Sequence, residues 1–149
     1  MSAPDAPGLI DSYLQLCEDR RLDEAGAFLA PQARLVFPGG REYSSLREMA
    51  AASTGTYRWV RKHRDRYLVG DDNGRVTVTS LGRLYGEWLD GTPFEDIRYA
   101  DVFVLDGALI VEQHVYNDLA LVASLRDACG HWGVAARRLT ATVASRRDA

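Results

Sequence analysis

Asp101 is the residue whose type and setting point most directly to chemistry. It interrupts a run of alternating apolar residues between Tyr99 and Leu105. Burial in an apolar cavity raises the pKa of a carboxyl group, which can then stay protonated as a hydrogen-bond donor or act as a base near neutral pH. The sequence equally allows a salt bridge from Asp101 to Arg98 or to an arginine of the neighbouring strand. Asp101 is therefore either a ligand-orienting or catalytic group, or a structural ion-pair partner.

His63 is the second candidate, because the ordinary pKa of imidazole suits acid and base work near neutral pH. It lies in the run WVRKHRDR, which begins at Trp59. Four cationic side chains surround it: Arg61, Lys62, Arg64 and Arg66. So basic a strand is typical of a solvated sheet edge, and a solvent-facing histidine is the alternative that stays open. Less often, such a strand is a rim that attracts an anionic substrate.

The sequence carries no motif for a metal, a phosphate group or a nucleophilic serine. Its histidines and acids show no HxH, HxxxH or CxxC spacing, and it has no glycine-rich phosphate loop. We therefore expect no metal and no cofactor. A net charge of −3 argues against a nucleic-acid partner. No apolar run of roughly 18 residues and no secretory leader at residues 1–8 is found, which favours a cytoplasmic protein without a membrane partner.

The elements that must position these residues are mainly strands. Two alternating apolar runs meet at Asp106-Gly107, which is a strong hairpin signal, and the period changes to a helical one after Asn117-Asp118. The turn-rich stretch Gly70–Gly74 predicts a second hairpin. The long strands predicted in this way are Tyr57–Val69, Arg75–Trp88, Phe94–Leu105 and Leu109–Tyr116.

The N-terminal third reads differently. Helical spacing from Leu9 to Asp19 and again as far as Pro31 predicts two helices, which a short strand, Arg34–Phe37, and a short helix capped at Ser44-Ser45 follow. With 149 residues the chain fits one domain. We expect a lead-in at residues 1–8, the domain at residues 9–125, and a C-terminal helix with a polar tail at residues 126–149.

This order of elements, with a last strand ending in Tyr-x-Asp, closely resembles the nuclear transport factor 2-like, or SnoaL-like, superfamily. The stretches that carry the resemblance are Leu9–Gly40 and Arg98–Asp118 (RYADVFVLDGALIVEQHVYND). The resemblance implies an α+β cone, in which a strongly curved antiparallel sheet wraps around N-terminal helices and encloses a pocket, commonly in a dimer. Arg20-Arg21 stands where the family usually has a Gly-Asp pair, a departure that affects a turn rather than the pocket.

The resemblance and strand alternation together predict the pocket lining. Gly82 and Gly86 weaken a strand unless something approaches closely, so they indicate either space held for a ligand or a bend in the sheet. The predicted substrate-binding residues are Glu18, Phe37, Trp59, Leu84, Trp88, Tyr99, Phe103, Gln113, Val115 and Asn117.

Roles for individual residues come from branches of the superfamily. Similarity to ketosteroid isomerases implies that Asp101 donates to an oxyanion and that Tyr13 polarises a carbonyl, although Tyr13 also fits core packing. Phe37 occupies the position of that branch's general base, which excludes its mechanism. Val115 stands where epoxide hydrolases need a carboxylate. Scytalone dehydratase-like enzymes use a histidine on the first long strand, here matched by His63, and an acid late in helix one, near Glu18.

The sequence therefore predicts a cofactor-independent acid/base enzyme, a cyclase, isomerase or dehydratase, that acts on a hydrophobic polyketide- or steroid-like molecule through His63, Asp101 and Tyr13. This hypothesis requires His63 and Asp101 to point into one cavity. The alternative is a non-catalytic ligand-binding or dimerisation module of the same fold. We also expect a homodimer built on the outer face of the sheet, where Leu81, Tyr85 and Leu105 would otherwise be exposed.

Overall fold

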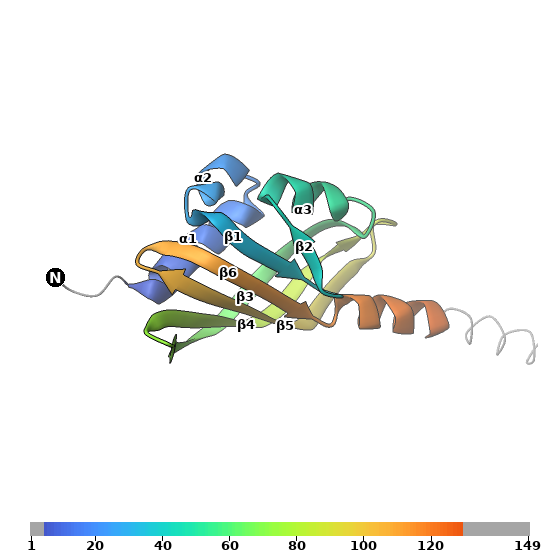
Figure 1. Ribbon diagram of the computed structural model, residues 1–149. Coiled ribbons are helices and arrows are strands. Elements are labelled where there is room, and N and C mark those ends of the chain that lie inside the picture. The colour runs from blue at the N-terminus through green and yellow to red at the C-terminus, as the bar shows by residue number, and fades with distance from the viewer. Residues whose placement is uncertain (1–4, 130–149) are drawn as a thin grey trace, which may run out of the picture. The chain divides into compact units, whose positions relative to one another are not determined.

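Residues 5–129 are described by the computed structural model of the chain (Figure 1). Residues 1–4 of the expected lead-in and residues 130–149 of the expected polar tail lie outside the described residues. The chain divides into two compact units, of which the first ends at Asn117 and the second begins at Asp118. In the second unit, residues 119–129 are helical, as the change of period predicted. No helix of the described residues is long and apolar enough to cross a membrane.

Helix α1 (Ala6–Glu18) begins inside the stretch expected to be a lead-in. It starts there because the Asp5 side chain accepts the N–H of Gly8 at 3.0 Å, which satisfies one of the free donors of the first turn. Its residues Ile10, Tyr13 and Leu14 recur at helical spacing and are buried. The apolar stripe of the sequence is thus the face by which α1 packs.

The turn from α1 to α2 (Leu22–Gly26) depends on Arg20, whose φ of 59° is left-handed. The N–H of Arg21 donates to the carbonyl of Leu16 at 3.0 Å, and that of Arg20 donates to the carbonyl of Cys17 at 3.2 Å. This is the Schellman pattern of a helix end, in which glycine usually takes the left-handed position. The departure at Arg20 therefore lies in a turn, as expected.

One six-stranded sheet contains all the strands of the first unit, in the order β2-β1-β6-β5-β4-β3. Its strands are β1 (Leu29–Phe37), β2 (Arg41–Tyr43), β3 (Tyr57–Asp72), β4 (Arg75–Trp88), β5 (Pro93–Asp106) and β6 (Leu109–Asn117), with helix α3 (Leu46–Ala52) between β2 and β3. The α+β cone with a curved sheet is confirmed, with one correction. The sheet is mixed, because β1 pairs with β6 in parallel while all other pairs are antiparallel.

The four long strands lie where the alternation predicted them, whereas β1 begins at Leu29 rather than near Arg34, and β2 was not predicted. The first hairpin turns at Asn73 and Gly74, whose φ angles of 52° and 85° fit a type I′ turn. Gly107, with a φ of 59°, lies in the turn between β5 and β6. Turn chemistry therefore located both hairpins, but β3 continues to Asp72, through the first part of the stretch predicted as a turn.

Gly82 and Gly86 lie at register shifts of the sheet, where Gly82 pairs with Arg64 of β3 and Gly86 pairs with Phe94 of β5. A Cβ atom on Gly82 would lie 1.9 Å from the carbonyl oxygen of His63 and 2.9 Å from the Tyr99 ring. On Gly86 it would lie 2.2 Å from the carbonyl oxygen of Trp59 and 2.8 Å from the ring of Phe94. Aromatic rings and the β3 backbone thus fill the space beside both glycines, so these positions hold no room for a ligand.

Candidate functional site

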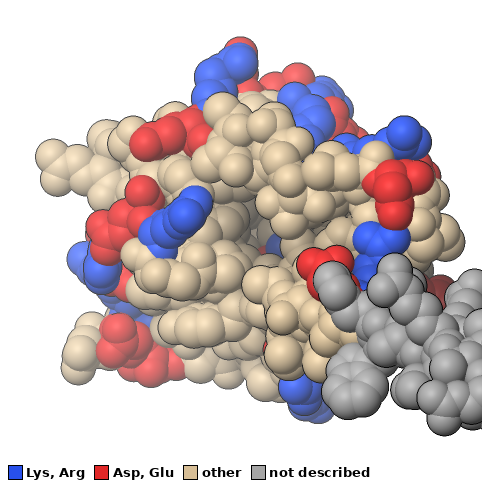
Figure 2. All heavy atoms as spheres, turned by 90° about the vertical axis from the view of Figure 1, so that its right-hand side faces the viewer, with Lys and Arg blue, Asp and Glu red and all other residues tan. Residues whose placement is uncertain are grey.

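The inner face of the sheet is defined here as the face that contacts α1. Tyr13 of α1 contacts this face directly. The Tyr13 ring packs edge-on against the Phe103 ring, with 5.8 Å between the two ring centroids. Strand register places further residues on this face beside Phe103. The predicted lining residues Leu84, Trp88, Tyr99, Phe103, Gln113 and Val115 are all buried. Figure 2 shows that the surface is hollowed at the centre of that view, among mainly uncharged residues.

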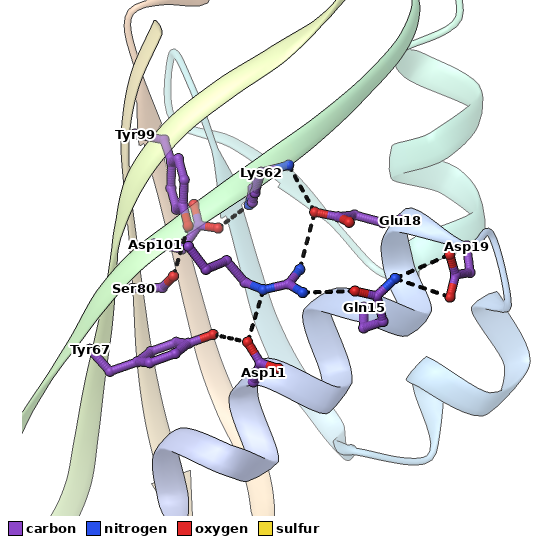
Figure 3. Close-up of polar contacts among 10 residues, drawn as sticks. Asp11, Gln15, Glu18, Asp19, Lys62, Tyr67, Ser80, Tyr99 and Asp101 are labelled. Atoms are coloured by element: carbon purple, nitrogen blue, oxygen red, sulfur yellow. Dashed lines mark hydrogen bonds and ion pairs between the residues drawn. The ribbon is translucent and has the colours of Figure 1, made fainter. Parts of the chain in front are cut away.

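Asp101 lies on this inner face with its side chain fully buried, and its Oδ2 accepts a hydrogen bond from Nζ of Lys62 (Figure 3). The ammonium nitrogen also lies over the Tyr99 ring, 4.7 Å from its centroid. The Lys62 side chain keeps 19% of its surface exposed. The ion-pair alternative for Asp101 is therefore correct in kind, but its partner is a lysine rather than an arginine.

The pKa values of Lys62 and Asp101 depend both on burial and on the charge of the other residue. Burial raises the pKa of Asp101, and the neighbouring Lys62 ammonium offsets this only in part. Burial lowers the pKa of Lys62, but the Asp101 carboxylate outweighs that effect and the pKa is raised overall. Among the described residues, Oδ1 of Asp101 is a buried side-chain atom without a hydrogen-bond partner. Lys62 is thus a protonated donor. Its partner is a carboxyl group whose pKa is raised by burial.

Three hydroxyl groups and the Gln113 amide complete the buried polar set. The Ser80 and Tyr99 hydroxyls lie 3.0 Å apart, and burial raises the pKa of Tyr99. Tyr13 donates its hydroxyl to Oε1 of Gln113 at 2.6 Å and is fully buried. Its pKa lies well above the usual value because of burial. Tyr13 therefore uses its donor inside the core, as the packing alternative held, and does not present it to a ligand.

His63 lies on the opposite, outer face of the sheet. Its ring stacks on Tyr85 at 4.2 Å and an interplanar angle of 19°, and the residue is exposed. Trp59 is 41% exposed and also packs against Tyr85, at 6.0 Å between ring centroids. Since neighbouring residues of a strand point to opposite faces, the inward direction of Lys62 turns His63 outward. The expectation that His63 and Asp101 share one cavity, and that Trp59 lines it, was wrong.

The other predicted residues have different surroundings. Phe37 lies at the end of β1, half-buried against Tyr43 at 5.5 Å between rings. Asn117 stands opposite Tyr99 at the end of β6. Glu18 accepts the backbone N–H of Lys62 at 2.8 Å and an N–H of Arg64 at 3.1 Å. Glu18 is thus directed at β3 rather than at a ligand.

Sequence reasoning missed Lys62, although a signal for it existed. Lys62 is the only lysine among 18 basic residues. Arginine fills every other basic position, so Lys62 supplies the only side-chain ammonium. The pKa of this compact group changes readily with burial and neighbouring charge, whereas a guanidinium stays protonated. No group of three or more His, Cys, Asp or Glu within residues 5–129 is placed to hold a metal ion.

Comparison with known proteins gives likeness at the level of structure. No family model and no curated protein matches the sequence. A nuclear transport factor 2-like protein from Burkholderia thailandensis E264 is 25% identical, covering 83% of this chain and 97% of its own, with a TM-score of 0.62. TerC, co-crystallised with polyporic acid, is 16% identical over 79% of this chain and 95% of its own, with a TM-score of 0.63.

A candidate polyketide cyclase from Xanthomonas campestris pv. campestris is also similar. It is 16% identical, covers 74% of this chain and 88% of its own, and has a TM-score of 0.54. These likenesses extend over most of each solved chain, so the whole fold is shared rather than one motif.

Proposed function

Because the chain has the nuclear transport factor 2-like fold, we propose that it is a small cofactor-independent acid/base enzyme whose reacting group is the Lys62–Asp101 pair. The reaction class is that of a cyclase, isomerase or dehydratase acting on an apolar, polyketide- or steroid-like molecule. Lys62 replaces His63 in this proposal, because His63 lies on the outer face.

The observation that carries the proposal is the Lys62 side chain, which is 19% exposed and places its ammonium against a fully buried carboxylate. An ammonium fixed in an apolar site can give its proton to a hydroxyl oxygen that leaves as water when its C–O bond breaks. It can also stabilise the negative charge on a carbonyl oxygen when solvent water takes up the proton of a neighbouring C–H bond. The low local dielectric makes this donation stronger than in water. Asp101 holds the donor in place and keeps it charged.

The charges of the inner face indicate a neutral substrate. Lys62 is paired with Asp101, and Arg64 is paired with Asp11 and Glu18. Neither cation is left to neutralise an anionic ligand. A molecule with a carbonyl or hydroxyl oxygen on an apolar ring system suits these surroundings better than a carboxylate or a phosphate. The solved structures of a candidate polyketide cyclase and of TerC with polyporic acid support a ring-containing small molecule as the ligand, although not its neutral charge.

A second candidate function, a non-catalytic binding module, is favoured by the burial of Asp101. Its carboxylate is fully buried and already paired, so it offers no accessible base to a bound molecule. A module of this kind would bind the same apolar ligands through Lys62 and release them unchanged.

The test begins with native mass spectrometry of the purified protein against a panel of aromatic hydroxyketones and hydroxyquinones. Any molecule that binds is then incubated with the protein and with Lys62→Met, and product is followed by chromatography. Conversion that requires Lys62 supports the enzyme, whereas Lys62-dependent binding without conversion supports the module. Binding and conversion that both survive in Lys62→Met would refute the proposal.

A further inference from the structure

One polar stripe of α1 is aimed at β3. Asp11, Gln15 and Glu18 follow at intervals that place them on the same face of the helix. Each faces a different nitrogen of Arg64: Nη2 donates to Gln15 at 2.7 Å, Nη1 donates to Glu18 at 3.1 Å, and Nε forms an ion pair with Asp11 at 2.8 Å (Figure 3). The Arg64 side chain is only 15% exposed. Its guanidinium is therefore used to join α1 to β3.

Glu18 also accepts a hydrogen bond from the backbone of β3. The oxygen that faces Arg64 also accepts the backbone N–H of Lys62 at 2.8 Å. β3 is the last strand of the sheet, so one side of its backbone has no neighbouring strand. The Glu18 side chain, only 10% exposed, takes the place of a strand partner at the residue that carries the ammonium.

We propose that Glu18 is a positioning residue, which fixes the β3 backbone at Lys62, with Arg64 as its anchor, so that the ammonium stays at Asp101 and over Tyr99. The inference rests on the proposed function for the importance of Lys62 to the ligand. It differs from the expectation that Glu18 contacts substrate, because both contacts of its carboxylate are with β3.

The need for such a contact follows from the lysine side chain. Its four-carbon stem is flexible and carries about 2 kcal/mol of rotamer entropy, so a mobile backbone beneath it would scatter the ammonium. The charged and titratable groups facing Lys62 are Asp101 and Tyr99 from β5 and Cys17 and Glu18 from α1. A change in the Lys62 pKa can therefore come from movement away from Asp101 or from loss of the Glu18 charge.

Two substitutions separate these causes. Glu18→Gln removes the charge but keeps an oxygen that can accept the Lys62 N–H, whereas Glu18→Ala removes both. Glu87→Gln is the matched control. Glu87 of β4 pairs with Arg58, which lies on β3 like Lys62, and it makes no contact with Lys62 itself. Since Lys62 is the only lysine, isotope-labelled lysine gives one backbone amide signal and one ammonium signal in NMR spectra.

We expect Glu18→Ala to speed hydrogen exchange of the Lys62 amide by roughly 10-fold or more and to lower the Lys62 pKa as the ammonium leaves Asp101. Glu18→Gln should stay close to the parent protein in both, and Glu87→Gln should change neither. Parental exchange and pKa in Glu18→Ala would overturn the inference. Equal pKa values in the Ala and Gln variants would also overturn it, because charge alone would then explain the shift.

If Glu18→Ala does not fold, the parent protein still decides. Its Lys62 amide should exchange more slowly than the other amides on the free side of β3, and equal rates would overturn the inference. None of these measurements uses a ligand. Failure of the proposed function would show instead as ligand conversion that persists in Lys62→Met, while the Lys62 amide of the parent protein is protected by Glu18.

Discussion

Lys62 and Asp101 form their ion pair across an intervening strand, because β4 separates β3 from β5 in the sheet. The pair is also unequal. The Asp101 side chain is completely buried, whereas the Lys62 side chain is 19% exposed. A charge that can reach water tolerates the loss of its partner better than one that cannot. Several outcomes depend on this inequality.

Lys62→Met should destabilise the protein more than Asp101→Asn. The methionine variant leaves a fully buried carboxylate unpaired, which costs about 3–5 kcal/mol near neutral pH. The asparagine variant leaves an ammonium that can extend towards water. Urea unfolding of the two variants at the same pH measures the difference. Equal losses of unfolding free energy would contradict the unequal burial of the pair.

The loss in Lys62→Met should depend on pH with a definite sign. Burial raises the folded-state pKa of Asp101 above its ordinary value, so the folded protein favours the protonated form at low pH. The stabilisation that the protonated Asp101 contributes is fully present below its pKa in the unfolded state. It is lost as the pH rises through its pKa in the folded state. The variant should therefore approach the stability of the parent protein in acid. The double variant with Asp101→Asn should lack this dependence.

The same pair shows what the sequence could and could not predict. Asp101 and the four long strands were found, because alternation and Asn-Gly or Asp-Gly turns act over short distances. Lys62 was not predicted because its partner lies two strands away, and because the inward-facing residue of β3 is Lys62 rather than its neighbour His63. Alternation gives two sets of side chains but does not say which set faces inward. The α1 stripe that binds Arg64 decides this, and only tertiary contact reveals it.

Arg20→Gly should stabilise the protein by up to about 1 kcal/mol, because a non-glycine residue in the left-handed region is disfavoured by roughly 1–2 kcal/mol and glycine returns part of this as unfolded-state entropy. Arg21→Gly is the matched control. Arg21 has an ordinary φ of −85°, so its replacement should stabilise nothing. Thermal unfolding of both variants checks this, and a lower melting temperature in Arg20→Gly would disprove it.

A homodimer through the outer face remains a prediction, with one of its residues withdrawn. Leu105 is 2% exposed and belongs to the core, so it cannot form that surface. Trp59 and Tyr85 pack together on the outer face and are the apolar groups best placed to be covered. Light scattering should give twice the chain mass of 16.5 kDa, and Trp59→Glu should reduce it. A monomer at micromolar concentration would contradict the prediction.

Asp101→Asn should weaken binding of any ligand that depends on Lys62. The amide keeps the size of the carboxyl group but no longer holds or charges the ammonium, so burial should now lower the Lys62 pKa. We expect affinity to fall by roughly 10-fold or more, which is about 1.4 kcal/mol. Calorimetry on the folded variant measures this. Lost stability with unchanged affinity would make Asp101 a structural ion-pair partner alone.

The chemistry of the single lysine provides the last prediction. Acylating reagents attack neutral amines, and the carboxylate of Asp101 raises the pKa of Lys62 and keeps it protonated. At a mildly alkaline pH the N-terminal amine should therefore react first, while Lys62 reacts more slowly than the same lysine in urea-unfolded protein. Asp101→Asn should speed the reaction, because burial then lowers the Lys62 pKa and frees the amine. Peptide mass spectrometry locates each adduct. Equal reaction rates in folded and unfolded protein would show that the ammonium is neither held nor shielded by Asp101.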